Sequence, residues 1–372
     1  MKTTIERSAL LKALNHVQSV VERRNTIPIL SNVLLEADNG SLGLTATDLE
    51  IEMRERVEAD VAQPGAITAP AHMLYDIVRK LPDGAQVELS TDETGGRLVL
   101  VSGKSSFALQ TLPREDFPAM AQDEMPVAFA LLGGDLRRLI EKTRFAISQE
   151  ETRYYLNGIY LHALEDDGKA LLRAVATDGH RLARVQMAQP VGAADMPAII
   201  VPRKTVGEVQ KLLEEETGEV SLQVSETKIN FAFSNIVLTS KLIDGKFPDY
   251  TRVIPLNNDK VLGVDAKSFA QSVDRVSAIS SEKSRAVKLA LEGDRLSLSV
   301  SNPDSGSASD ELSVSYAAEA MEIGFNARYL MDITGQLDGE SATFELADSG
   351  SPTIVRDGED TDALYVLMPM RV

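Results

Sequence analysis

Residues 111–118 read TLPREDFP and residues 241–248 read KLIDGKFP, so the same Phe-Pro pair ends both segments, 130 residues apart. The tetrapeptide ATDL at 46–49 is matched by ATDG at 176–179, again 130 residues later. Two matches that agree in order and spacing indicate an internal repeat, which is the first pattern to look for in a long chain.

Further matches extend the repeat over the whole chain. ILSNVLLEA at 29–37 corresponds to YLNGIYLHA at 155–163, and a more divergent third copy contains LSLSVSNPD at 296–304. The chain therefore reads as three similar units of roughly 125 residues. We place the three domains at residues 1–125, 126–256 and 257–372.

Each unit carries two helical patterns and several short strands. Apolar residues recur at intervals of three and four, which is typical of a helix with one buried face. These stretches are Leu10–Val21, Leu74–Leu81, Leu136–Thr143, Val206–Leu213, Phe269–Val276 and Leu330–Leu337. Alternating or apolar runs separated by turn residues predict strands, in the first unit at Val33–Glu36, Leu42–Ala46, Ile51–Val57, Val87–Ser90, Leu98–Val101 and Phe107–Leu112. The predicted fold class is α+β, with two helices against an antiparallel sheet in each unit.

The composition excludes several kinds of site. The 372 residues include no cysteine, which rules out disulfides, thiolate metal sites and a cysteine nucleophile. Four histidines are present, without the spacing of a zinc protease, and Gly103-Lys104-Ser105 lacks the first glycine of a phosphate-binding loop. We therefore expect no metal and no cofactor.

The N-terminal sequence resembles an amphipathic helix and not a secretion signal. No apolar run approaches the roughly 18 residues that a membrane-spanning helix requires. We expect a cytoplasmic protein with no membrane partner.

The segment Thr177–Leu182, TDGHRL, allows three interpretations. Asp178 beside His180 suggests half of a catalytic triad, although no G-x-S-x-G motif supplies a nucleophile. The same residues also suit an ordinary polar turn, or the wall of a surface pocket.

The formal net charge of −18 argues against nucleic-acid binding when only the sum is considered. The predicted helices are locally basic, however: residues 7–24 contain four basic and one acidic residue, and residues 199–211 contain three and one. Such a chain can hold a polyanion against its helices and repel it elsewhere, although helix surfaces commonly carry Lys and Arg.

Several motifs together resemble the beta subunit of bacterial DNA polymerase III, the sliding clamp family, over essentially the full length. They are Thr26–Leu30 (TIPIL), Thr47–Glu50 (TDLE), Arg153–Gly158 (RYYLNG), Ala176–Leu182 (ATDGHRL), Val201–Lys204 (VPRK), Phe247–Tyr250 (FPDY) and Met368–Arg371 (MPMR). The resemblance implies a non-catalytic protein that forms a head-to-tail homodimer, a closed ring of six domains around double-stranded DNA. It also implies as partners the alpha subunit of the replicative polymerase, the clamp loader, and other polymerases and repair proteins.

In this family, partners bind through short linear motifs to a groove between the second and third domains. Carried over to this sequence, the groove comprises Leu156, Thr177, Gly179, His180, Arg181, Leu182, Pro248, Arg252, Val253, Val366, Met368, Pro369, Met370 and Arg371. The apolar members would take Leu and Phe side chains, and the arginines would meet polar groups at the rim.

The resemblance also implies DNA contacts and a dimer contact. The DNA-contact positions correspond to Arg24, His72, Glu150, Tyr154 and Tyr155; we add Gln149, because a carboxylate at 150 faces phosphate unfavourably, and Arg203 and Lys204 from the start of a helix. The dimer contact is expected to join Phe107 and Leu109 to Ala278 and Ile279, although Phe107 also suits a core position.

Two other functions remain open from the residues alone. One is an acidic hydrolase that uses Asp178 and His180. The other is a scaffold that is built from the same repeats and does not bind DNA.

Overall fold

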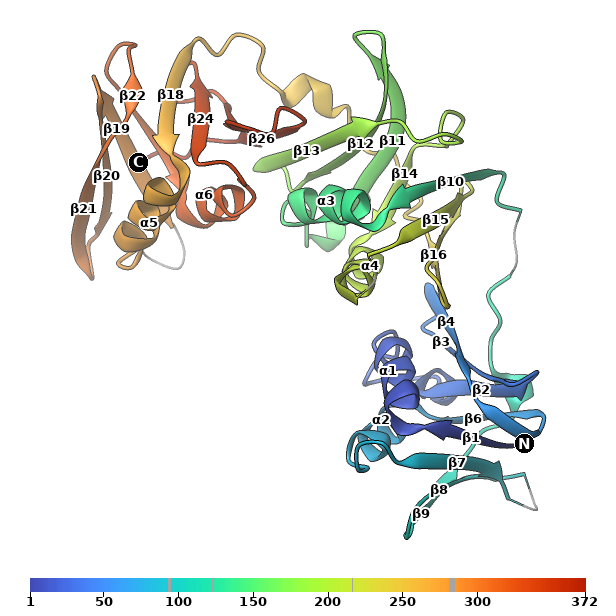
Figure 1. Cartoon of the computed structure of the whole chain (residues 1–372). Coiled ribbons are helices and arrows are strands. Elements are labelled where there is room, and N and C mark those ends of the chain that lie inside the picture. Colours follow the sequence, from blue (N-terminus) through green and yellow to red (C-terminus); the bar gives the residue numbers. More distant parts are fainter. Residues whose placement is uncertain (93–94, 122–123, 216, 281–284) are drawn as a thin grey trace. The chain divides into compact units, whose positions relative to one another are not determined.

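The computed structural model describes residues 1–92, 95–121, 124–215, 217–280 and 285–372. Its element order repeats three times, as a strand, a helix, a group of strands, a second helix and three strands (Figure 1). The predicted three-domain α+β fold is confirmed. Each predicted helical stretch contains a helix, although Val21, Leu81 and Leu337 lie just beyond the helix ends.

The first domain contains more strands than the sequence pattern predicted, because β1, β5 and β6 were not foreseen. Its elements are β1 (Lys2–Glu6), α1 (Arg7–Gln18), β2 (Asn32–Asp38), β3 (Ser41–Thr47), β4 (Ile51–Glu58), β5 (Asp60–Gln63), β6 (Gly65–Pro70), α2 (Ala71–Arg79), β7 (Gln86–Thr91), β8 (Arg97–Ser102) and β9 (Ser105–Gln110). Short 3-10 turns lie at Pro28–Ser31 and Arg114–Asp116.

The second and third domains follow the same plan. The second consists of β10 (Val127–Leu132), α3 (Gly133–Arg144), β11 (Gly158–Asp166), β12 (Lys169–Thr177), β13 (Arg181–Ala188), β14 (Ile199–Pro202), α4 (Arg203–Glu215), β15 (Glu219–Val224), β16 (Lys228–Ala232) and β17 (Ile236–Lys241), with 3-10 turns at Glu151–Leu156 and Tyr250–Val253. The third consists of β18 (Lys260–Asp265), α5 (Ala266–Ser277), β19 (Ala286–Glu292), β20 (Arg295–Asn302), β21 (Gly306–Ser313), β22 (Ser315–Tyr316), β23 (Met321–Asn326), α6 (Ala327–Thr334), β24 (Ser341–Leu346), β25 (Thr353–Asp357) and β26 (Ala363–Leu367).

The helices form because an apolar stripe is buried and the first turn is capped. In α1, Leu10, Leu14 and Val17 are fully buried, and the carboxylate of Glu6 accepts hydrogen bonds from the first backbone N–H groups. In α5, Phe269 is fully buried and Asp265 caps the first turn.

Two sheets run across domain boundaries, which the repeat alone did not predict. The eight-stranded sheet β10-β15-β16-β17-β4-β3-β2-β6 joins the second domain to the first by pairing β17 with β4. The nine-stranded sheet β14-β11-β12-β13-β26-β25-β24-β18-β22 joins the second to the third by pairing β13 with β26. All strand pairs are antiparallel, as predicted.

Because of these shared sheets, the chain forms two compact units. The first unit contains Met1–Leu136, Pro190–Pro197 and Lys204–Leu242, and the second contains Arg137–Gln189, Ala198–Arg203 and Ile243–Val372. The second domain therefore contributes strands to both units.

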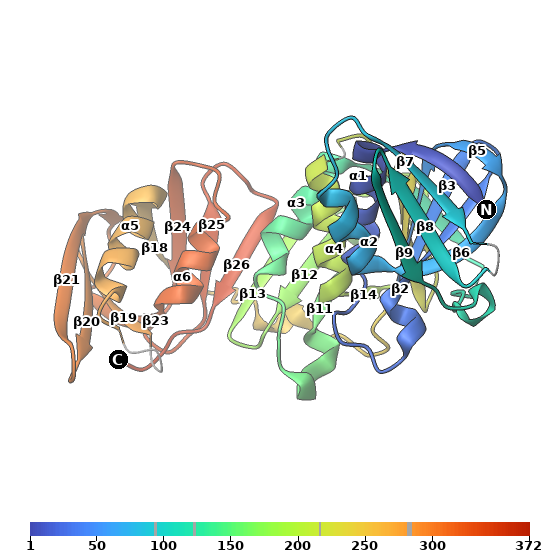
Figure 2. The ribbon, with the colours of Figure 1, turned by 90° about the horizontal axis from the view of Figure 1, so that it is seen from below.

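Two further sheets end in open edges. The five-stranded sheet β5-β1-β7-β8-β9 ends at β9, and the four-stranded sheet β21-β20-β19-β23 ends at β21. Figure 2 shows β21 as the outermost strand beside β20 and α5. Unpaired edge strands can pair with another chain.

A buried ionic cluster connects α1 to β4 and α4 in the first unit. His16 Nδ1 lies 2.8 Å from Oε2 of Glu55, and its Nε2 lies 3.4 Å from Oε2 of Glu215. Burial by itself lowers the pKa of His16. The hydrogen bond and negative charge of Glu55, together with the charge of Glu215, have a larger and opposite effect, so the pKa is raised above 6.5.

The stability of this cluster should therefore depend on pH. The charged imidazole stabilises the folded unit fully below pH 6.5, the pKa of the unfolded group, and this contribution is lost as pH rises through the raised folded pKa. We expect urea unfolding to show a stability that falls as the pH rises above about 6.5. His16→Gln, which does not titrate, should flatten this decline, and an unchanged decline would contradict the assignment.

His16→Ala should lower the free energy of unfolding by about 3 kcal/mol, because it leaves Glu55 buried without its cation.

Candidate partner-binding and DNA-facing sites

An apolar cluster lies on one face of the nine-stranded sheet, where β13 pairs with β26. It consists of Leu156, Val175, Leu182, Ile200, Phe247, Tyr250, Ile354, Leu364 and Val366, all buried. Leu182 and Val366 are direct cross-strand neighbours. Pro248, Val253 and Met368 are exposed next to it in sequence, with Val253 and Met368 49% and 40% exposed. We call the cluster and these three exposed residues the partner surface.

The C-terminal tail is held in place by backbone hydrogen bonds. Met368 N donates to His180 O at 2.9 Å, and Met370 N donates to Gly324 O at 2.7 Å. A Cβ atom added to Gly324 would lie 2.6 Å from Met370 O, so the tail packs directly against this glycine. These contacts place Met368, Pro369 and Met370 at one end of β26.

The TDGHRL segment is a tight turn. Thr177 Oγ1 accepts a hydrogen bond from Gly179 N, and Asp178 Oδ1 accepts from the backbone N–H groups of His180 and Arg181. Gly179 has φ +88°, which favours glycine. The His180 ring stacks on Tyr329 with centroids 6.3 Å apart. The Asp178 carboxylate therefore shapes the turn and does not orient the His180 imidazole, which removes the basis of the hydrolase hypothesis.

Arg181 differs from its predicted role at the groove rim. Its side chain is buried, and its guanidinium contacts Asp178, Asp332 and the carbonyl of Phe145. It also lies 4.3 Å from the centroid of Tyr329. These contacts satisfy the guanidinium inside the protein and tie β13 to α6.

Two other arginines lie nearer the surface. Arg153 forms an ion pair with Glu150, whose pKa is lowered by this hydrogen bond, and a Cβ atom on Gly179 would lie 2.5 Å from Arg153 Nη1. Arg252 is highly exposed and pairs with Asp249. Arg153 was not among the predicted site residues, although its motif was noted.

The predicted DNA-contact residues fall into two groups. Arg24, Gln149, Glu150, Tyr154 and Arg203 are exposed, and Tyr155 is half-buried with its ring 5.8 Å from that of Tyr154. The ion pair with Arg153 partly offsets the negative charge of Glu150, which would otherwise repel a DNA phosphate.

His72 and Lys204, also predicted to contact DNA, both have partners inside the first unit. His72 Nδ1 lies 2.7 Å from Gln18 Oε1 and its Nε2 3.0 Å from Val21 O, so the ring ties α2 to α1. Lys204 Nζ contacts Glu22 and lies 2.6 Å from Asp48 Oδ2. Two carboxylates on one ammonium leave little charge for phosphate.

Two of the four predicted dimer residues lie on the edge strand β9, and the other two follow α5. Phe107 is half-buried and Leu109 is buried on β9, while Ala278 and Ile279 follow α5. Asn302 Nδ2, at the end of β20, donates to Ile279 O at 2.9 Å. Ala278 and Ile279 therefore lie beside the β20–β21 hairpin.

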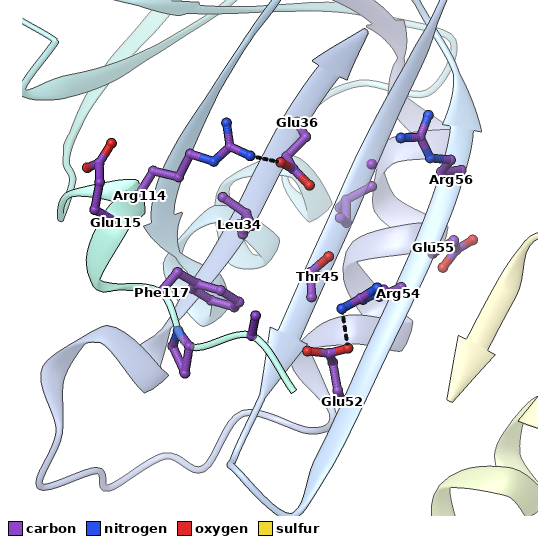
Figure 3. A pocket seen from close by; sticks show the side chains of 14 residues that line it. Leu34, Glu36, Thr45, Glu52, Arg54, Glu55, Arg56, Arg114, Glu115 and Phe117 are labelled. Carbon is purple, nitrogen blue, oxygen red and sulfur yellow. Dashed lines mark hydrogen bonds and ion pairs between the residues drawn. The ribbon is translucent and has the colours of Figure 1, made fainter. Parts of the chain in front are cut away.

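The first domain carries a polar counterpart of the partner surface. A cavity of about 570 Å³ is lined by β2, β3, β4 and residues 114–119 (Figure 3). Thr45 and Glu52 stand there 130 residues before Val175 and Leu182. Glu52 pairs with Arg54 at 2.7 Å, and Arg114 pairs with Glu36 at 2.6 Å. The cavity therefore holds paired charges where the second domain buries apolar side chains.

Three family models match successive parts of the chain. They describe the N-terminal, central and C-terminal domains of the DNA polymerase III beta subunit, and match residues 1–121, 131–249 and 251–371. The chain belongs to this family. Its function is that of a sliding clamp, a non-catalytic accessory subunit of DNA polymerase III.

Full-length relatives agree with this membership. The beta sliding clamp of Caulobacter vibrioides is 56% identical over 372 residues and covers 100% of both chains. A crystal structure of the sliding clamp of Bartonella birtlesii bound to griselimycin is 54% identical, with a TM-score of 0.97 and 100% coverage of both chains. The clamp from Caulobacter crescentus is 56% identical, with a TM-score of 0.96 and the same coverage.

Among the described residues, no group of three or more His, Cys, Asp or Glu side chains could hold a metal ion. Over the same part of the chain, no helix is both long enough and apolar enough to span a membrane.

Proposed function

We propose that two copies of this chain close head to tail into a ring that encircles duplex DNA. The observation that carries this proposal is the repetition of one strand pairing. β4, β13 and β21 occupy equivalent places in the three domains, as do β17, β26 and β9. Within the chain, β4 pairs with β17 and β13 pairs with β26. The strands left over are β21 and β9, so pairing them between copies repeats the same junction twice and closes the assembly.

The repeat also supplies a register for the junction between copies. Met53 is the cross-strand neighbour of Leu238 in the β4·β17 pair. The β20·β21 pair has the same register as the β3·β4 pair, and it puts Ala308 on β21 at the position of Met53 on β4. In the same way, comparing the β8·β9 pair with the β16·β17 pair puts Phe107 on β9 at the position of Leu238 on β17. We therefore place Phe107 of one copy opposite Ala308 of the other.

A weak and diffuse lining suits a protein that must slide. Exposed Arg24 and Arg203, with Gln149, Tyr154 and Tyr155, supply contacts that do not read sequence. The high negative charge of the rest of the chain opposes DNA binding elsewhere. Retention then comes from topology, and the affinity of each contact can stay low.

The partner surface suits the binding of other proteins, which is the second part of the proposed function. Buried Leu182 and Val366 with exposed Met368 offer an apolar site for Leu and Phe side chains of a short peptide. A relative bound to griselimycin supports ligand binding by this family. Partners would include the replicative polymerase alpha subunit, the clamp loader, and other polymerases and repair proteins in the cytoplasm. Tethering by this site raises the effective concentration of the enzyme at the DNA.

The domain boundaries remain as proposed from the sequence, at 1–125, 126–256 and 257–372. Phe117 lies between β9 and β10, and the 3-10 turn Tyr250–Val253 lies between β17 and β18, close to these two proposed boundaries.

A pair of cysteines tests the ring directly, because the natural chain has none. Directly opposed residues of an antiparallel pair lie about 5 Å apart at Cβ, close to disulfide distance. The double variant Phe107→Cys with Ala308→Cys should run as a cross-linked dimer after oxidation, on a denaturing gel without reductant.

The matched control is Ala108→Cys with Ala308→Cys. Ala108 is exposed and its side chain alternates to the other face of β9, so cross-linking should be several-fold weaker. Equal cross-linking of both pairs, or monomers from both, would contradict the proposed junction.

A further inference from the structure

Three arginines extend the partner surface along the same face of the nine-stranded sheet. Arg184 lies two residues beyond Leu182 on β13, and its direct cross-strand neighbours are Val175 and Leu364. All three of these neighbours belong to the apolar cluster. Residues two apart on a strand, and residues directly opposite each other, point to the same face. Arg184 is therefore surrounded by the residues that form the partner surface.

The other two arginines have their own partners. Arg173, on β12, contacts Asp166, Gln186 and the hydroxyl of Tyr250. Arg356, on β25, donates to Glu345 at 2.7 Å. Asp166 and Glu345 are thus each paired with one of these two guanidinium groups.

Arg184, unlike the other two arginines, has no carboxylate partner among the described residues. Its Nε is buried without a hydrogen-bond partner, and among the described residues no ion pair to Arg184 is found. Burial, with the charges of Arg173 and Arg356, lowers its pKa. A half-buried cation without an anion is costly, so this position favours an anionic ligand.

Nearby titratable groups do not supply the missing charge. The pKa of His162 is lowered to about 4 by burial and by Arg173, so this histidine is neutral at physiological pH. Asp362, just before β26, accepts a hydrogen bond from the side chain of Gln186 at 3.4 Å. Tyr250 already accepts from Arg173.

We propose that Arg184 receives the carboxylate of an Asp or Glu residue that flanks the apolar core of the partner peptide. This inference rests on the proposed function, because it assigns the chemistry of the peptide that occupies the partner surface. A peptide carboxylate fits better than a nucleic-acid phosphate, because both cross-strand neighbours of Arg184 are apolar residues of this surface.

The test compares two labelled peptides with the same core, which contains Leu and Phe. One peptide carries two Asp residues beside the core, and its twin carries two Asn residues at the same positions. This pair of peptides is made in two versions, one with the two residues before the core and one with them after it. Fluorescence anisotropy should show that one acidic peptide binds the wild-type protein about tenfold more tightly than its Asn twin.

Arg184→Met should remove this preference and keep the affinity for the Asn twin. Arg295→Met, which removes one exposed arginine of the four-stranded sheet, is the control and should keep the preference. Equal binding of the twins to wild type, or an unchanged preference in Arg184→Met, would overturn the role of Arg184 while leaving the partner surface intact. If neither peptide bound at all, the proposed peptide site itself would fail, and this inference with it.

Discussion

Deletion of Met370–Val372 should reduce the affinity for a peptide containing Leu and Phe by about a hundredfold. The hydrogen bond from Met370 N to Gly324 O is one of the two that hold the tail. Its removal leaves Pro369 without this anchor, although Met368 N still bonds to His180 O, and it removes the Met370 side chain from the proposed site. Anisotropy titration of the labelled peptide measures the loss.

The dimer should survive this deletion, because β9 and β21 contain none of the deleted residues. Sedimentation velocity should give the same assembly mass for the deletion variant and for wild type. A variant that bound peptide normally would show that the tail contributes nothing to the site. A variant that lost the dimer would show that the tail is structural.

A substitution in β23 should reproduce the effect with the tail present. In Gly324→Ala, the new Cβ would lie 2.6 Å from Met370 O and 2.3 Å from a Val372 methyl group, so the tail must move. Gly207→Ala is the matched control, because no atom lies within 4 Å of the Cβ that it adds. We expect weakened peptide binding in the first variant and normal binding in the second.

The repeat predicted the domains and helices, but it did not predict how the domains join. Strand patterns show which residues are buried, and they do not show which strand lies beside which. The pairing of β4 with β17 brings together Met53 and Leu238, which are far apart in the chain. Sheets shared between domains therefore had to be found in the structure.

The structure brings several apolar residues of the predicted groove together, and their role in binding stays a prediction. Leu156, Leu182 and Val366 lie together in one buried cluster, consistent with the resemblance to the family. The surroundings of charged residues were harder to predict, because their ion-pair partners are distant in the sequence. Arg181 pairs with Asp332 and Lys204 pairs with Asp48, and neither ion pair could be read from the sequence.

The polar cavity of the first domain explains why the peptide site need not repeat with the fold. Glu52 stands where Leu182 stands in the second domain, and its charge is matched by Arg54. A few substitutions, such as Thr45 for Val175 and Glu52 for Leu182, can thus change an apolar surface into an ion-paired one while the backbone plan is kept.

Circular DNA should retain the covalently closed ring even when every non-covalent contact has been destroyed. The double variant Phe107→Cys with Ala308→Cys would be placed on a nicked circular plasmid by a clamp loader with ATP, and then oxidised. Detergent unfolds the protein and removes electrostatic binding, but a cross-linked ring around a circle cannot leave it. A protein that only touches the DNA surface has no such restraint.

This measurement tests encirclement most directly. We predict that protein bound before the detergent step remains with the circular plasmid in SDS, and that it is released by reductant or by cutting the plasmid once. Without oxidation, SDS alone should release it. Cross-linked dimers that leave the intact circle in SDS would contradict the account, because such dimers would have closed beside the DNA and not around it.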